Sequence, residues 1–370
     1  MFMCHSKEVQ FRHATFQGTS YEIGRKQAEM IQRYYPGEID FLFNGNQFTR
    51  PLSPEKLKAV IGLFDRYCPY LNEEIRGFAD YFHKSPEEVI YYSFSGVVKG
   101  QCSQFAVLPQ GTADGKAYAG RSYEWDADDD KRLLTVKADG LYVHLGFSML
   151  LFGRYDGMNE KGLYVTMTNG APLVTPVEEG LRFWAIIRIL LAQCANVDEA
   201  VEMIKRLPVS SFVCLAVTDR NHQATLIEIA NDVKTIKRIN LSTDSGYLCS
   251  ANHYTLPEMQ VHVRNRMQHS IDRYGAMVKV LESGPVDKAA LMKLLSSKMP
   301  EGMACHFYNE GLGTLWSVLY DVDEGKADIC FGSPLVNPWH SFDLNTPEGI
   351  KTYQALLPDE EAAPTNWARV

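Results

Sequence analysis

One cysteine, Cys102, stands where the sequence changes from a helical pattern to a strand-like one. Most intracellular cysteines pack inside an element as small apolar side chains, so this boundary position favours a chemical role. If the Gln101–Cys102 bond were cleaved, Cys102 would carry a free α-amino group, whose reference pKa of about 7.7–8.0 suits a general base near neutral pH. One residue would then supply both the nucleophile and the base. A thiol, with a reference pKa of about 8.5, needs such a base or a nearby cation to ionise at pH 7.

The chain before Cys102 has a helical pattern with two clear helix starts. At Ser53-Pro54-Glu55 and at Ser85-Pro86-Glu87-Glu88, a capping serine precedes a proline at the first helical position, and Glu88 completes a capping box. We therefore expect residues 1–101 to consist of helices and loops.

From Cys102 onward the pattern is typical of strands. CSQFAVL at 102–108, a turn at 112–115 and KAYAGRSY at 116–123 together predict a β-hairpin. Strands and helices then come in clusters, which predicts an α+β fold with antiparallel sheets covered by helices, not a regularly alternating parallel sheet. The later expected strands are 133–138, 142–151, 162–168, 212–218, 224–230, 314–322 and 326–332, and the expected helices are LRFWAIIRILLAQ, VDEAVEMIKRL, the stretch 264–281 and KAALMKLLSS.

The composition of the chain indicates its domain number and limits the kinds of molecule that it could bind. The 370 residues are 45% hydrophobic and 22% charged, which fits one large globular domain or two modest ones. The net charge is -8 and no run of Lys or Arg is dense, so we expect no nucleic-acid partner. The N-terminus lacks the pattern of a secretory signal and no apolar run reaches membrane-spanning length, so the expected location is cytoplasmic.

The metal-binding and nucleotide-binding motifs are missing from the sequence. The eight cysteines are scattered without a C-x-x-C pair, the histidines form no H-E-x-x-H, and no P-loop or G-x-G-x-x-G follows a strand. The sequence therefore indicates no metal and no other cofactor.

The segment GQCSQFAVLPQGTADGKAYAGRSYEW, residues 100–125, resembles the nucleophile segment of the isopenicillin N acyltransferase-like family of N-terminal-nucleophile hydrolases. This family is related to bile salt hydrolases, penicillin V acylases and acid ceramidase. Its members share a nucleophilic cysteine followed by a hydroxyl residue, a hairpin with Asp-Gly at the turn, and a return strand similar to Gly-Arg-Asn-x-Asp-Trp. Here Ser122 replaces the usual Asn, and Glu124 replaces the usual Asp. The resemblance implies a four-layer α-β-β-α sandwich in which Cys102 opens a central strand.

The likeness extends to the N-terminal segment. GTSYEIG at 18–24 and LNEEIRGFADYFHKSPEEVIYYSF at 71–94 look like the leader of acyltransferase-type precursors, which bile salt hydrolases lack. The resemblance therefore implies a helical leader, 1–101, and a catalytic domain, 102–370. It also implies autocleavage between Gln101 and Cys102, after which the leader would stay bound as a second chain.

Two further segments resemble those that carry the family's asparagines. GMNEKGLYVTMTNG at 157–170 resembles the strand that ends beside the oxyanion, here at Asn169, and SANHY at 250–254 resembles the segment with the principal oxyanion residue, here Asn252. Attack on an amide carbonyl places negative charge on its oxygen, and fixed neutral donors stabilise that charge.

The resemblance also assigns charged residues around the cysteine. Arg121 is expected to lower the pKa of the thiol, and Glu124 to contact the Cys102 amine, with Asp126 as its substitute. Arg273 in HSIDRY is the expected second arginine, a role that the segment at His306 would fill instead in the acyltransferase branch. The implied catalytic set is Cys102, Arg121, Glu124, Asn169, Asn252 and Arg273.

Simpler interpretations exist for parts of this set, and two rival functions stay open. Asn169-Gly170 is a dipeptide that strongly favours a turn, so Asn169 could have only a structural role. Arg121 and Glu124 have opposite charges and could simply pair with each other on a solvated strand. One rival is an unprocessed site in which Cys102 pairs with His253 or His306. The other is a catalytically silent binding protein on the same fold, suggested by Ser122, Glu124 and the bulky residue before the cleavage point.

The expected reaction follows from the family. The resemblance implies a hydrolase or acyltransferase that acts on linear carbon–nitrogen amide bonds of N-acyl small molecules through an acyl-thioester on Cys102. An amine or a thioester would be the co-substrate. The sequence leaves open the acyl and amine groups, the choice between hydrolysis and transfer, and whether copies of the chain form a homo-oligomer.

Overall fold

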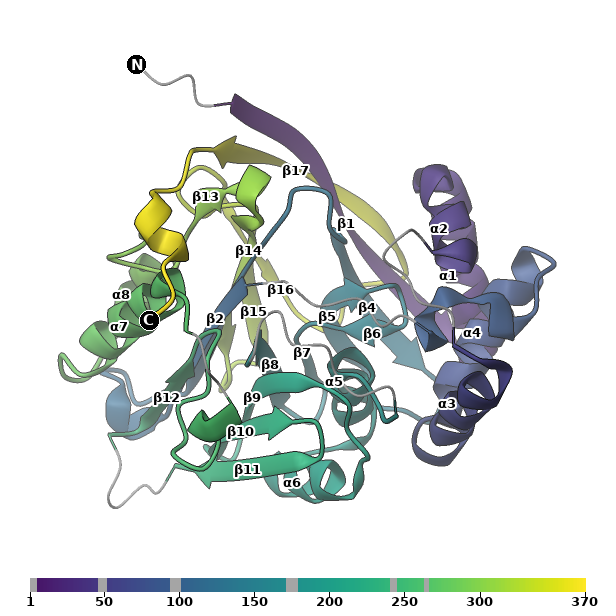
Figure 1. Cartoon of the computed structure of the whole chain (residues 1–370), viewed down its shortest axis with the longest axis horizontal. Helices are drawn as coiled ribbons and strands as arrows, with labels where there is room; N and C mark the ends of the chain where they lie inside the picture. The colour runs from purple at the N-terminus through teal and green to yellow at the C-terminus, as the bar shows by residue number, and fades with distance from the viewer. Residues whose placement is uncertain (1–4, 46–51, 94–100, 171–178, 240–244, 263–265) are drawn as a thin grey trace.

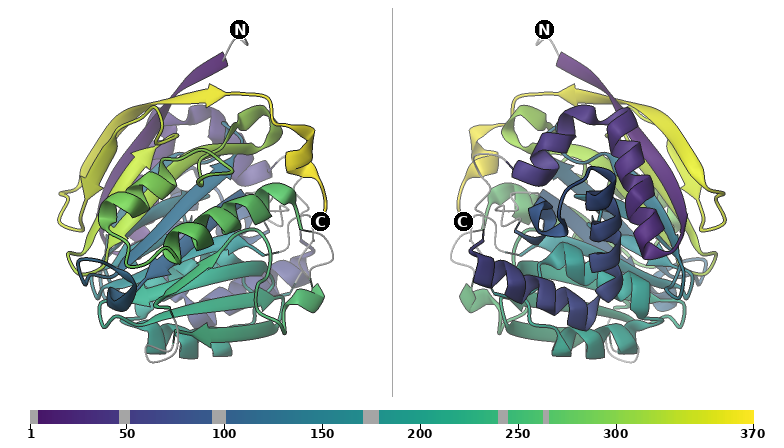
Figure 2. Two further views of the ribbon diagram at one scale, coloured as in Figure 1. Left: turned by 90° about the vertical axis from the view of Figure 1, so that its left-hand side faces the viewer. Right: turned by 90° about the vertical axis from the view of Figure 1, so that its right-hand side faces the viewer.

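Two β-sheets lie face to face in the protein, and helices cover both outer faces (Figure 1). The computed structural model describes residues 5–45, 52–93, 101–170, 179–239, 245–262 and 266–370. Figure 2 shows one helical layer in front of the sheets in its left view and the other in front of them in its right view. This arrangement is the α-β-β-α sandwich expected from the sequence.

The first sheet contains ten described strands in the order β11-β10-β9-β8-β7-β5-β4-β1-β17, with β6 beside β5. Every named strand pair in the two sheets is antiparallel except β1 with β4, which is parallel. In this order the strands are Val233–Arg238, Ala224–Ala230, Phe212–Asp219, Leu163–Asn169, Gly157–Asn159, His144–Met149, Arg132–Ala138, His5–Gly18, Gly349–Asp359 and, for β6, Gly153–Arg154.

The second sheet contains seven described strands in the order β12-β2-β3-β14-β15-β16, with β13 beside β14. In this order they are Tyr247–Ser250, Gln101–Val107, Tyr118–Trp125, Leu312–Asp321, Lys326–Phe331, Trp339–Phe342 and, for β13, His306–Phe307. The hairpin predicted after Cys102 is confirmed as β2 and β3, which pair in register from Gln101 opposite Glu124 to Val107 opposite Tyr118.

The helices divide between the two outer faces. Helices α7 and α8 contact the second sheet through β2, β12, β3 and β14, whereas α1 and α5 contact strands of the first sheet. The predicted periodic helices are confirmed as α5 to α8. The helices are α1 Ser20–Tyr34, α2 Ile39–Asn44, α3 Pro54–Tyr67, α4 Pro69–Tyr81, α5 Phe183–Gln193, α6 Val197–Arg206, α7 Gln268–Leu281 and α8 Lys288–Leu295.

The N-terminal segment is not made of helices and loops alone, as the sequence had led us to expect. Residues 5–18 form β1, which pairs with β17 through eleven residue positions and with β4 on its other side. Val9 and Phe11 are buried between more exposed neighbours, as the period of two of a strand requires, whereas residues 13–16 are all buried. The predicted start at Ser85 opens only a three-residue 3₁₀ helix, Pro86–Glu88, although the capping box with Glu88 is present.

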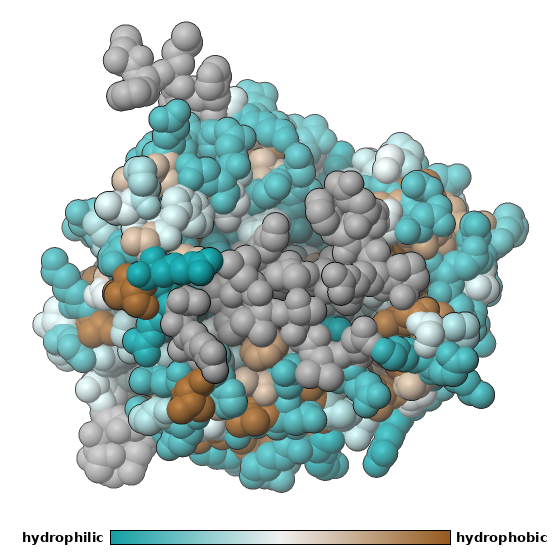
Figure 3. Space-filling view, in the orientation of Figure 1, coloured by the Kyte–Doolittle hydropathy of each residue, from teal (hydrophilic) through white to brown (hydrophobic). Residues whose placement is uncertain are grey.

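Hydrophobic burial fixes the layers. Helix α5 is buried on nearly all sides, with Ile186, Ile187 and Leu190 fully covered. The face in Figure 3 is mostly hydrophilic, with apolar residues in separate groups. Within the described ranges, no helix is both long and apolar enough to cross a membrane.

Close packing of α1 on α4 depends on two glycines. A Cβ atom at Gly24 would lie 1.8 Å from the carbonyl oxygen of Glu74, and one at Gly77 would lie 2.0 Å from that of Tyr21. Because both obstacles are backbone atoms, neither can move aside without shifting a helix.

We expect Gly24→Ala to lower the free energy of unfolding by about 1–3 kcal/mol, since the added methyl group forces α1 and α4 apart. Gly62→Ala in α3 is the matched control, because a Cβ there meets nothing within 4 Å. It should be neutral or stabilise by up to about 1 kcal/mol through helix propensity. Urea unfolding, with Cys102→Ala as the common background, measures both; equal midpoints for the two variants would contradict this packing.

Candidate active site

The β2–β3 hairpin places Cys102 among polar groups on two sides. Cys102 is the second residue of β2 and lies opposite Tyr123 of β3. Because side chains alternate along strands, Cys102, Arg121 and Tyr123 point toward the first sheet, whereas Ser103 and Glu124 point toward α7. The site therefore has a sheet side and a helix side.

On the sheet side, the thiol contacts a fixed guanidinium. Nη2 of Arg121 donates to Sγ of Cys102 at 3.1 Å, and Nε of Arg121 donates to the carbonyl oxygen of Met167 at 2.8 Å. Cys102 is only 1% exposed. Burial raises the pKa of its thiol to about 11, and the positive charge of Arg121 opposes this rise. In the uncleaved chain the thiol is therefore protonated at neutral pH.

On the helix side, the backbone nitrogen of Cys102 contacts Asn252. It donates to Oδ1 of Asn252 at 2.9 Å, and Nη2 of Arg273 donates to the same oxygen at 2.8 Å. Because both groups donate to the same atom, that atom must be the oxygen of the Asn252 side-chain amide, since the NH₂ group cannot accept a hydrogen bond. Nδ2 of Asn252 in turn donates to the carbonyl oxygen of Asn169 at 3.2 Å.

Glu124 lies in the same network and pairs with Arg273 in the uncleaved chain. Its carboxylate accepts from Nη1 of Arg273 at 3.1 Å, from Thr314 at 3.3 Å and from Ser122. Burial raises the pKa of Glu124 to about 7, against the opposing effect of Arg273. The carboxylate thus holds the arginine while Asn252 binds the Cys102 nitrogen. Asp126, the expected substitute for Glu124, is exposed directly after β3.

All six predicted residues belong to one buried cluster, which Asn169 joins through its backbone carbonyl. Arg273 connects two other members of this set, Asn252 and Glu124, and also contacts Ser103. Sequence reasoning missed Asp156, whose carboxylate accepts from Arg121, and Thr314. Asp156 precedes Gly157 in a segment that resembles a turn, so no local signal marked it.

The two histidines of the rival site are engaged elsewhere. Nδ1 of His253 pairs with Ser270 at 2.8 Å, and burial lowers its pKa to about 4. Both ring nitrogens of His306 have partners, Glu360 and Ser333. The hydrogen bonds of these rings therefore do not support a cysteine–histidine pair at Cys102.

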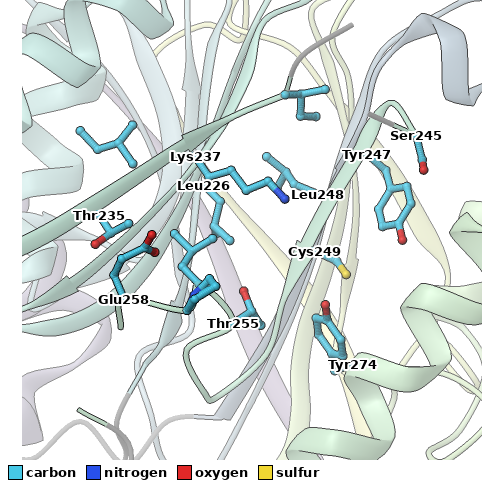
Figure 4. A pocket seen from close by; sticks show the side chains of 14 residues that line it. Leu226, Thr235, Lys237, Ser245, Tyr247, Leu248, Cys249, Thr255, Glu258 and Tyr274 are labelled. Carbon is cyan, nitrogen blue, oxygen red and sulfur yellow. The ribbon is translucent and has the colours of Figure 1, made fainter. Parts of the chain in front are cut away.

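A separate cavity of about 610 Å³ lies between the edge strands of the two sheets. Figure 4 shows Leu226 and Lys237 from the first sheet on one side and Leu248 and Cys249 from the second on the other, with Tyr274 of α7 below. None of the six predicted site residues lines it. Thr255, which lines this cavity, follows Asn252 by three residues in the sequence.

A family model described as acyl-coenzyme A:6-aminopenicillanic acid acyl-transferase matches residues 111–335, which is more than half of the chain. The chain belongs to this acyl-transferase family. The matched range begins after Cys102 and contains Arg121, Glu124, Asn169, Asn252 and Arg273. Membership in the acyl-transferase family confirms the resemblance found in the sequence and identifies the chain as an enzyme.

Several solved structures are also similar to this acyl-transferase family member. A variant of conjugated bile acid hydrolase from Clostridium perfringens is 15% identical, with a TM-score of 0.45 over 71% of this chain and 99% of the other. Penicillin V acylase from Agrobacterium tumefaciens is 14% identical, with a TM-score of 0.47 over 68% and 90%. The Caenorhabditis elegans orthologue of N-acylethanolamine-hydrolyzing acid amidase is 16% identical, with a TM-score of 0.43 over 60% and 93%. No curated protein sequence matches the chain.

The raised pKa of Glu124 predicts a pH-dependent contribution to stability. The folded protein holds this proton up to about pH 7, whereas the unfolded chain loses it near pH 4.5. The contribution is therefore fully present below pH 4.5 and is lost as the pH rises toward 7. Relative to Glu124→Gln, the free energy of unfolding of the parent should fall by about 1–3 kcal/mol across this window.

Urea unfolding of the parent and Glu124→Gln at intervals from pH 4 to pH 8 measures this difference, with Cys102→Ala as the common background. Every other titrating group is shared and cancels in the comparison. A difference that stays constant over the whole range would show that Glu124 has the same pKa in the folded and unfolded chains.

Proposed function

We propose that the chain is the precursor of a cysteine-dependent amide hydrolase or acyltransferase, whose nucleophile is Cys102, released by cleavage after Gln101. The observation that carries this proposal is that both reactive atoms of one residue are held by fixed polar groups. The nitrogen lies 2.9 Å from Oδ1 of Asn252, and the sulfur lies 3.1 Å from Nη2 of Arg121. A structural cysteine requires neither contact.

Cleavage would begin with attack of the Cys102 sulfur on the carbonyl carbon of Gln101. The new S–C bond replaces the C–N bond, and the released nitrogen receives the thiol proton, which yields a thioester. Water then hydrolyses the thioester to a carboxylate on Gln101 and a free thiol on Cys102. The nitrogen released in the first step is the amine that can act as the base, and the uncleaved chain lacks it.

The leader, residues 1–101, stays bound after cleavage in this proposal. Strand β1 lies between β4 and β17 of the catalytic domain, 102–370. A fully buried ion pair also joins the two parts, with Nη2 of Arg188 in α5 at 2.7 Å from Oε2 of Glu74 in α4. Separating the parts would leave a buried charge without its partner.

In turnover, the freed amine would remain on Oδ1 of Asn252 and take the thiol proton. The thiolate, stabilised by Arg121, attacks the carbonyl of an N-acyl substrate and expels the amine with that proton. Nδ2 of Asn252 has a second hydrogen beyond the one donated to Asn169, and this hydrogen would bind the oxyanion. The resulting acyl-thioester on Cys102 is resolved by water or by an amine acceptor.

The substrate class is that of N-acyl small molecules with a linear amide bond. The acyl-transferase family is described by a thioester donor and an amine acceptor, so transfer and hydrolysis use the same acyl-thioester. In both reactions the chain itself supplies the nucleophile, the base and the oxyanion donors, and no cofactor enters the proposal.

Intact-mass analysis of the purified protein should show two chains, residues 1–101 and residues 102–370, which elute together. Cys102→Ala should remain one chain and lack activity toward a panel of N-acyl amides, because the nucleophile is gone. Cys249→Ala and Cys305→Ala are matched controls that should cleave like the wild type. Full activity in a single uncleaved species would contradict the proposal.

We expect Asn252→Ala to slow cleavage by about 10²–10³-fold, because it removes one oxyanion donor and the acceptor of the Cys102 nitrogen. The precursor should accumulate, and a time course of intact masses gives the rate. Asn221→Ala, at an exposed turn, is the control and should cleave at the wild-type rate. Equal rates for the two variants would remove Asn252 from the mechanism.

A further inference from the structure

A second carboxylate lies behind the arginine that contacts the Cys102 sulfur. Oδ2 of Asp156 accepts from Nη1 of Arg121 at 2.5 Å, and both side chains are 0% exposed. Arg121 comes from β3 of the second sheet, whereas Asp156 directly precedes β7 of the first. The ion pair therefore bridges the two sheets next to the thiol.

Asp156 is itself held on both oxygens. Nε1 of Trp316 donates to Oδ2 at 3.1 Å, and the backbone nitrogen of Phe147 donates to Oδ1 at 3.3 Å. The indole of Trp316 is stacked between Phe147 and Tyr123, with ring centroids 4.0 and 4.1 Å apart. The backbone is also confined, since a Cβ on Gly146 would lie 2.0 Å from the carbonyl oxygen of Asp156. This carboxylate cannot turn away from Arg121 without disturbing the stack.

The two arginines of the site are paired with two different carboxylates. Glu124 binds Arg273 on the helix side, and Asp156 binds Arg121 on the sheet side. Arg121 divides its donors among four acceptors, namely Asp156, the carbonyl oxygen and the sulfur of Met167, and the Cys102 sulfur. Because Asp156 carries the compensating negative charge, it limits the net positive charge that the sulfur experiences.

We propose that Asp156 is the positioning residue and counter-ion of Arg121, so that it orients this guanidinium and sets its electrostatic pull on the Cys102 sulfur. This inference rests on the proposed function of Cys102. Asp156 does not touch the sulfur and acts only through Arg121.

The test is the pH dependence of Cys102 alkylation by iodoacetamide in the cleaved protein, followed by peptide mass analysis. Asp156→Asn keeps the shape and one acceptor but removes the charge. The midpoint of its profile should fall by about one pH unit, because Arg121 is no longer neutralised. Its limiting rate at high pH should fall by about threefold, since a less basic thiolate is a weaker nucleophile.

Two variants separate this role from a merely structural one. Asp156→Glu keeps the charge, so its midpoint should not fall. Asp219→Asn removes another fully buried carboxylate, one that binds only backbone nitrogens at Val197, Asn221 and Gln223, and should leave the profile unchanged. An Asp156→Asn profile with the wild-type midpoint overturns the inference.

The remaining outcomes are also decisive. If Asp156→Asn folds but stays uncleaved while Asp156→Glu and Asp219→Asn cleave, the charge is required and the inference stands. If Asp156→Asn does not fold, the test depends on Asp156→Glu. A fall in the midpoint of the Asp156→Glu profile would then contradict the role of the charge. If wild-type Cys102 reacts no faster than a model thiol, the proposed function fails, whereas a reactive wild type with an unaltered Asp156→Asn profile refutes only the role of Asp156.

Discussion

The site depends on one constraint, the in-register pairing of β2 with β3. That pairing sets Cys102 opposite Tyr123 and turns Arg121 to the same face as the thiol, while Glu124 turns to the other face. Because side chains alternate along a strand, the two ion pairs lie on opposite faces of the sheet. Arg121 with Asp156 lies on the face of the Cys102 sulfur, and Arg273 with Glu124 lies on the face where Asn252 accepts from the Cys102 nitrogen. A slip of one residue would exchange the two faces and bring the acid, not the arginine, to the thiol.

Local signals were sufficient for the hairpin, for the later strands and for helices α5 to α8. The hairpin has a turn of Ala113, Asp114 and Gly115 between two apolar runs, and α6 alternates buried Val197, Ala200 and Val201 with charged positions. Resemblance to a family supplied what these patterns could not, namely which asparagines and arginines belong together. In the structure, the six predicted site residues form one connected set of contacts. This set includes Arg273, whose only support in the sequence was a short match within α7.

What the sequence could not provide is non-local. Strand β1 was missed because its edges are satisfied by β4 and by β17, which lies more than three hundred residues later. The contact of Glu124 with Arg273 was not predicted for the same reason, since no spacing along the chain reveals that Arg273 reaches across from α7. The pairing of Asp156 with Arg121 spans two sheets, and each residue alone is an ordinary polar position beside a strand.

The pairing of β1 with β17 has a consequence for how the protein is made. The first described strand finds its antiparallel partner only in the last one, so this ladder cannot form until nearly the whole polypeptide has been synthesised. Contacts between such distant segments form slowly, because a very long loop must close. Until it does, β1 presents an open edge that other chains could join. The nascent protein therefore passes through a stage in which it is exposed to mispairing, and rapid capture of β17 protects it.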